Sequence, residues 1–124
     1  MIPRATPEIH QNDFGSILQF EIRNGKNSVV DLSQDFCAAE ILFMRPDGST
    51  FTRSAQLLPQ DDSATPLGRN GIVFYVLQPG DITVAGNWFL QVYVSFAAGG
   101  WYSSVISIVV FPNLVDLNNS GLSP

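Results

Sequence analysis

The chain offers few side chains that could do covalent or acid–base chemistry. It has one histidine, His10, and one cysteine, Cys37. A nucleophile needs a base held within hydrogen-bonding distance, and His10 stands in a proline-flanked stretch that gives it little support. Metal sites usually draw on several His and Cys side chains, and this pair is far apart in the sequence. We therefore expect His10 to be a solvated surface residue and Cys37 to be a small apolar residue packed in a strand.

Acidic residues and glycines do not form a recognisable site either. Asp61 and Asp62 are adjacent in a long loop, but they lack the alternating acidic spacing of a calcium loop. Gly99 and Gly100 stand between two predicted strands, where no helix N-terminus could bind a phosphate. The other acids are scattered, so no two of them are singled out as the carboxylate pair of a glycosidase. The sequence predicts a protein that is not an enzyme and has no cofactor or metal site.

Charge and hydropathy restrict the partners of the chain. The formal net charge is −5, and the six basic residues are scattered along the sequence. Nucleic acids and anionic membrane surfaces attract clustered positive charge, so both are poor partners. The first residues lack the apolar core of a signal peptide, and no apolar run reaches the roughly 18 residues of a membrane span. We therefore expect synthesis in a cytoplasm and no membrane contact.

The number of charged residues is unusually low for a soluble domain. The chain has 124 residues, enough for one domain, and only 14 % of them are charged, against roughly 25 % in an average domain. A small domain has a large surface for its volume, so part of this surface must be uncharged or apolar. This composition indicates a face that a neighbouring subunit covers.

The elements that would carry such a face are predicted to be β-strands. Proline and glycine fall between the apolar or alternating segments and not inside them, which is typical of a β protein. Asn24-Gly25 and the stretch 46–48 (PDG) are strong turn signals. Seven strands without any helical period predict an all-β, immunoglobulin-like sandwich. The predicted strands are residues 16–23, 28–32, 37–45, 50–58, 72–77, 87–96 and 101–111.

Both ends of the chain are predicted to be extended arms. Residues 1–14 form an N-terminal arm, residues 15–113 the sandwich, and residues 114–124 a C-terminal tail. Such ends either fray or become ordered by docking on neighbouring subunits. Residues 59–71 form the longest loop, and the sequence assigns it no role.

The last two predicted strands are apolar on both faces, although a two-layer sandwich needs only one apolar face per strand. Tyr102 and Ile106 are predicted to share a face of strand 101–111, and Phe89 and Tyr93 lie opposite the Trp88 face of strand 87–96. We expect Phe89, Tyr93, Tyr102 and Ile106 to contact another subunit. Two alternatives stay open. Loops or the arms could cover this face, or sugars could stack on the exposed aromatic rings of Tyr93, Tyr102 or Trp101.

The segment 81–88 (DITVAGNW) is similar to the corner that precedes a core strand in immunoglobulin-like folds. Trp88 stands where those folds have a tyrosine, so the usual hydroxyl bond cannot form. We expect Trp88 to fill the core.

Three segments in this order resemble the N-terminal immunoglobulin-like domain of phage baseplate upper proteins. They are VVDLS (29–33) with FMRPDGST (43–50), DITVAGNWFLQVYV (81–94) and YSSVISIVVFPN (102–113). The resemblance covers roughly residues 15 to 113 and implies the same sandwich fold. It implies a virion structural protein, assembled in the host cytoplasm, that attaches a fibre or adaptor to the tail or baseplate.

A single short sandwich also suits a capsid decoration protein, and a carbohydrate-binding module is the alternative outside the virion. The expected partners are other virion proteins and further copies of the chain. The resemblance implies no catalytic or ligand-binding residue.

Overall fold

The computed structural model of the chain describes residues 2–4, 8–58 and 66–114, and in these residues it is an all-β protein. The prediction of an all-β protein is thereby confirmed. No helix in the described part is long and apolar enough to cross a membrane. The described strands are β1 (Ile2–Arg4), β2 (Ile9–His10), β3 (Ile17–Glu21), β4 (Phe36–Met44), β5 (Thr50–Leu57), β6 (Ile72–Val76), β7 (Gly86–Phe96), β8 (Gly99–Tyr102) and β9 (Ile106–Phe111).

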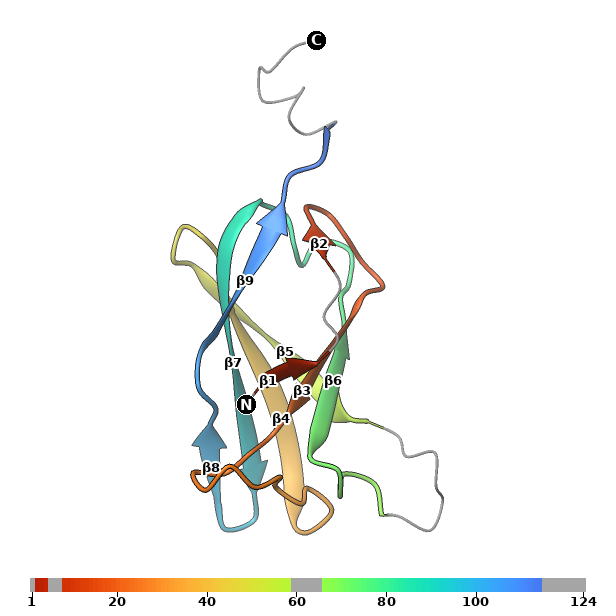
Figure 1. The fold of residues 1–124 in the computed structure, drawn as a ribbon, viewed down its shortest axis with the longest axis vertical. Coiled ribbons are helices and arrows are strands. Elements are labelled where there is room, and N and C mark those ends of the chain that lie inside the picture. The colour runs from red at the N-terminus through yellow and green to blue at the C-terminus, as the bar shows by residue number, and fades with distance from the viewer. Residues whose placement is uncertain (1, 5–7, 59–65, 115–124) are drawn as a thin grey trace.

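The strands form one continuous, strongly curled sheet (Figure 1). Its order is β1-β3-β6-β5-β4-β7-β9-β2, and β8 pairs with β7 outside this path. The strand β5 joins the two halves, because its first part pairs with β4 while Gln56 and Leu57 pair with β6. All pairs are antiparallel except β2 with β9, which is parallel. The curl brings the β3–β6 half over the β4–β7 half and encloses the core.

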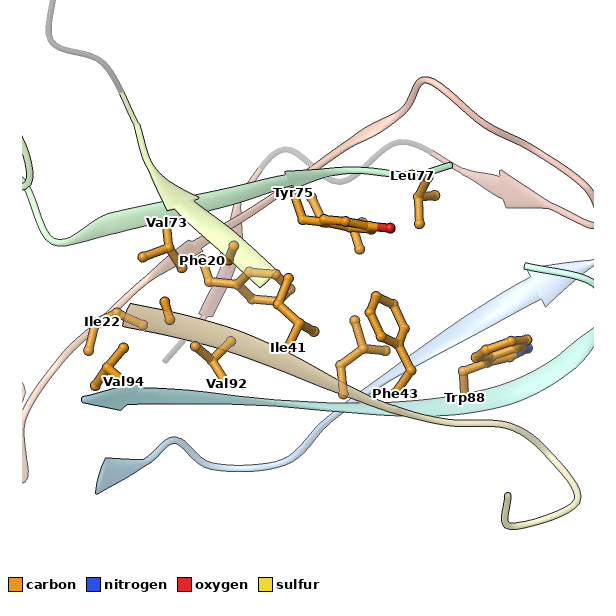
Figure 2. Close-up of a cluster of buried hydrophobic side chains, with 14 of the residues drawn as sticks. Phe20, Ile22, Ile41, Phe43, Val73, Tyr75, Leu77, Trp88, Val92 and Val94 are labelled. Carbon is orange, nitrogen blue, oxygen red and sulfur yellow. The ribbon is translucent and has the colours of Figure 1, made fainter. Parts of the chain in front are cut away.

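The core follows from the alternation along each strand, since every second side chain points to the same face. Trp88 is fully buried, and its indole N–H donates a hydrogen bond to the Val84 carbonyl at 3.0 Å. The prediction that Trp88 fills the core is thereby confirmed. The indole N–H also makes a polar contact with the corner segment 81–88. Figure 2 shows Phe20, Val73, Tyr75 and Leu77 from one half facing Ile41, Phe43, Trp88, Val92 and Val94 from the other.

Nine strands are described where seven were predicted. The predicted strand at 28–32 is wrong, because only one isolated bridge forms there, between Arg23 and Val29. The predicted single strand at 101–111 is interrupted after Tyr102 and becomes β8 and β9. The other two strands, β1 and β2, lie in the predicted N-terminal arm and pair with β3 and β9. Residues 115–124 of the predicted tail and 59–65 of the long loop, with Asp61 and Asp62, lie outside the described residues.

The prediction that Cys37 is packed in a strand is wrong, whereas His10 lies at the surface as expected. Cys37 is exposed, because the β4–β7 register shifts between Phe36 and Ala38 and leaves Cys37 unpaired in a bulge. The His10 side chain is 37 % exposed, but the residue is held in β2, with its ring centroid 5.7 Å from that of Phe111 and its backbone N–H bonded to the Asp13 carboxylate. Both outcomes depend on pairing between strands far apart in the sequence.

Gly71 fixes the turn that leads into β6. Its φ is +71°, a conformation that side chains with a Cβ rarely adopt. A Cβ on Gly71 would lie 2.6 Å from Cγ1 of Val29 and 2.7 Å from the carbonyl oxygen of Val30. The turn therefore packs its backbone directly on the 29–30 segment, which covers the end of the core.

A buried carboxylate ties β5 and β6 to the turn before β7. Asp81 is only 1 % exposed, yet three donors surround it. Arg53 Nε donates to Oδ1 at 3.0 Å, and the Gln78 N–H donates to Oδ2 at 2.9 Å. The Tyr75 hydroxyl donates to Oδ2 as well. Burial, followed by this hydrogen bond, raises the pKa of Tyr75 to about 12, so the phenol stays protonated as a donor.

Candidate functional site

The sheet β4–β7–β9 exposes apolar side chains on the side that faces away from the core. Phe89 on β7 is 43 % exposed and stands beside Met44 of β4 in the ladder. We call this surface the outer face, and its apolar members are Leu42, Met44, Phe89, Tyr93, Tyr102, Val109 and Phe111. Glu40, which pairs with Tyr93, is the single charged side chain that β4, β7, β8 and β9 place on this face.

Three of the four predicted contact residues lie together on the outer face. Tyr93 and Tyr102 are partners in the β7–β8 ladder, with ring centroids 4.7 Å apart, and Tyr102 is 64 % exposed. Phe89 is four residues from Tyr93 on β7 and therefore points the same way. These positions agree with a shared surface, and their contact with another subunit stays a prediction.

The fourth predicted contact residue, Ile106, lies on the opposite face. It pairs with Leu90, which is buried, and it packs partly buried against the core. Tyr102 pairs with Tyr93 and Ile106 with Leu90, so β7 advances by three residues while the other strand advances by four. One extra residue in a strand moves every later side chain to the other face. The expectation that Tyr102 and Ile106 share a face is therefore wrong.

Ser103 holds this irregular junction together. Its N–H donates to the Val92 carbonyl at 2.8 Å, and its hydroxyl Oγ accepts a hydrogen bond from the Val92 N–H at 2.9 Å. The Ser103 carbonyl accepts from the Gln91 side chain at 2.9 Å. The Ser103 side-chain oxygen thus replaces a backbone acceptor at the point where the register along β7 shifts by one residue. Sequence reasoning missed Ser103, although a serine pair that interrupts an alternating strand is a weak signal for such a junction.

Replacing Ser103 with alanine is expected to lower the free energy of unfolding by about 1 kcal/mol, because the half-buried Val92 N–H loses its acceptor. Urea unfolding measures the loss, and hydrogen exchange should be faster at the Val92 amide than in the wild type. Ser107→Ala on β9 is the control, since the Ser107 hydroxyl makes no such bond among the described contacts. Equal exchange rates at Val92 in wild type and Ser103→Ala would contradict this role.

A groove opens beside β8, between this strand and the 22–30 segment that follows β3. Its volume is about 570 Å³. We call it the β8 groove, and its apolar walls are Ile22, Val30, Val92, Val94, Phe96 and Trp101. Trp101 pairs with Val94 and thus faces inward, but it remains 57 % exposed at the mouth of the groove. Arg23 and Asn24 line the polar side of the groove.

The described residues contain no cluster of three or more His, Cys, Asp or Glu side chains that could hold a metal ion. The buried Asp81 accepts hydrogen bonds from Arg53, Tyr75 and Gln78, so its role is structural.

A scan of the chain against models of protein families gives no match, and a search of curated proteins gives none either. The outer face and the β8 groove are thus the two surfaces from which a function can be argued.

Proposed function

We propose that this chain is a structural protein of a phage virion with an immunoglobulin-like fold, which attaches to a neighbouring virion protein through the outer face. The observation that carries the proposal is the exposure of Phe89, Tyr102 and Val109 on one sheet surface whose strands β4, β7, β8 and β9 place a single charge there. Large contiguous apolar surfaces are typical of sites that another protein covers.

The geometry favours a flat, extensive contact. The outer face spans three hydrogen-bonded strands: Met44 of β4 pairs with Phe89 of β7, and Val109 of β9 lies diagonally from Phe89, which itself pairs with Ser107. A second sheet can pack on such a surface at a spacing of about 10 Å, with the side chains interdigitating. Each large apolar side chain buried there contributes roughly 1.5–3 kcal/mol, so a few of them hold a subunit in place. The resemblance to phage baseplate upper proteins supports a tail or baseplate location.

Phe89→Asp is expected to reduce incorporation of the protein into particles about tenfold or more, because a charge would be buried in the contact. The variant should fold, since Phe89 is 43 % exposed on a surface away from the core. Particles grown with an epitope-tagged copy of the chain are purified, and immunoblots measure the copies per particle. Gold-labelled antibody on intact particles then gives the location.

Leu67→Asp is the matched control, because Leu67 is 51 % exposed but lies in the turn before β6. It should be incorporated like the wild type. Normal uptake of Phe89→Asp would remove the outer face as the attachment surface. Label over the head instead of the tail would make the chain a capsid decoration protein, and unlabelled particles would contradict a virion role.

A further inference from the structure

The strands β1 and β2 cover opposite ends of the sheet. β1 pairs with β3 at one end of the strand order, and β2 pairs with β9 at the other end. These two strands are consecutive in the sequence, so the start of the chain reaches both ends. Without β1 and β2, the strands β3 and β9 would each present unpaired N–H and C=O groups. Such groups pair readily with strands of other chains.

The link between β2 and β9 centres on Gln11. The Gln11 N–H donates to the Phe111 carbonyl at 2.8 Å, and the Asn113 side chain donates to the Gln11 carbonyl at 2.8 Å. Just before it, Ile9 is 2 % exposed and belongs to the core. The end of β9 is therefore covered by a segment that both packs on the core and bonds to the edge.

The outward side of these two strands is itself protected against pairing. The His10 N–H donates to the Asp13 carboxylate at 2.8 Å, and the His10 carbonyl accepts from the Asp13 N–H at 3.1 Å. The backbone groups of His10, which alternate with those of Gln11 and face away from β9, are thus bonded within the turn. Pro3, in the middle of β1, has no N–H to offer an added strand. Both are means by which natural sheets avoid pairing at their edges.

We propose that residues 2–4 and 8–13 act as an edge clasp, which keeps β3 and β9 from pairing with other chains and depends on the Gln11 N–H for its attachment to β9. The edge at β9 needs this protection, because β9 contains no charged residue and exposes Val109 and Phe111. The inference goes beyond the attachment through the outer face and does not depend on the virion assignment.

The local backbone allows a precise test of the clasp. Residues 10–13 form a type II turn, because the Asp13 N–H donates to the His10 carbonyl and Asn12, at the third position, has a φ of +69°. Proline is common at the second position of this turn, where Gln11 stands. Gln11→Pro therefore suits the turn, while it removes the N–H that bonds to β9.

Gln11→Ala is the matched control, because it loses the same side-chain bond to the Thr83 carbonyl and keeps the backbone N–H. Hydrogen exchange at the Phe111 amide should be faster in Gln11→Pro, since this amide lies on the β2 side of β9. Sedimentation velocity should show self-association of Gln11→Pro at concentrations about tenfold or more below those of Gln11→Ala. Both variants keep the same β8, so its edge does not affect the comparison.

Two further variants separate edge exposure from a general loss of stability. Gly71→Ala disturbs the contact with the 29–30 segment and leaves the clasp intact, so it should associate no more than the wild type. A chain without residues 1–4 uncovers β3 and keeps the buried Ile9 in place. It should associate more than the wild type. Circular dichroism establishes which variants are folded.

Three results would overturn the proposal. The first is a folded Gln11→Pro, or a folded chain without residues 1–4, that is as monomeric as its control. The second is an unchanged exchange rate at the Phe111 amide in Gln11→Pro. The third is equal association of Gly71→Ala, which would attribute the effect to lost stability and not to an uncovered edge.

Discussion

Asp81→Ala is expected to destabilise the protein by about 3 kcal/mol. The carboxylate is 1 % exposed and accepts hydrogen bonds from Arg53, Tyr75 and the Gln78 backbone. Hydrogen bonds to a charged group are each worth about 1.5–3 kcal/mol, and donors left unpaired in a buried place add their own cost. Arg53 is half-exposed and can regain water, which limits the total. The three donors come from β5, β6 and the following turn, so the substitution removes the links among these three segments at once.

Urea unfolding followed by circular dichroism measures this effect. Glu40→Ala is the control, since Glu40 is an exposed carboxylate in the middle of β4. It should change the free energy of unfolding by no more than about 0.5 kcal/mol. Asp81→Asn should be intermediate, because the amide keeps one acceptor oxygen but loses the charge. A loss below about 1 kcal/mol for Asp81→Ala would show that the cluster adds little to stability.

Gly71→Ala is expected to destabilise the protein by about 2–3 kcal/mol, through backbone strain and a steric clash together. The φ of +71° disfavours any residue with a Cβ. The new methyl group would also meet the Val30 carbonyl oxygen at 2.7 Å, and backbone cannot rotate away as the end of a side chain can.

Gly48→Ala separates the two causes. Gly48 has a φ of +90°, but nothing lies within 4 Å of the place where its Cβ would be. Its substitution should therefore cost only the conformational part, about 1 kcal/mol. Thermal unfolding of both variants beside the wild type gives the comparison. Equal losses for Gly71→Ala and Gly48→Ala would show that the contact with the 29–30 segment relaxes without cost.

Local signals in the sequence were sufficient to predict an all-β protein and much of its core. The turn at Pro46–Gly48 and the alternation on both sides predict the β4–β5 hairpin at 37–45 and 50–58, and the structure has it at Phe36–Met44 and Thr50–Leu57. Trp88 was placed in the core from the corner segment 81–88, and the alternating run that it begins agrees with this placement. These features depend on residues that are close in the sequence, so the alternation of apolar and polar residues predicts them directly.

Long-range pairing accounts for what the sequence did not predict. The face of Ile106 depends on one extra residue at the β8–β9 junction, and the placement of His10 depends on β9. The outer face could be predicted in part, because Phe89 and Tyr93 follow from alternation alone. The β8 groove could not, because it lies between segments that come together only in the folded chain. The partner that each surface binds stays a prediction.

The environments of the two tryptophans differ enough to make them separate optical reporters. Trp88 is fully buried with its indole N–H bonded, while Trp101 is 57 % exposed at the mouth of the β8 groove. Emission at short wavelengths therefore monitors the integrity of the core, and emission at long wavelengths, accessible to iodide, monitors the open end of the sheet. A single unlabelled sample can thus distinguish occupancy of that end from loss of the fold, without any introduced dye.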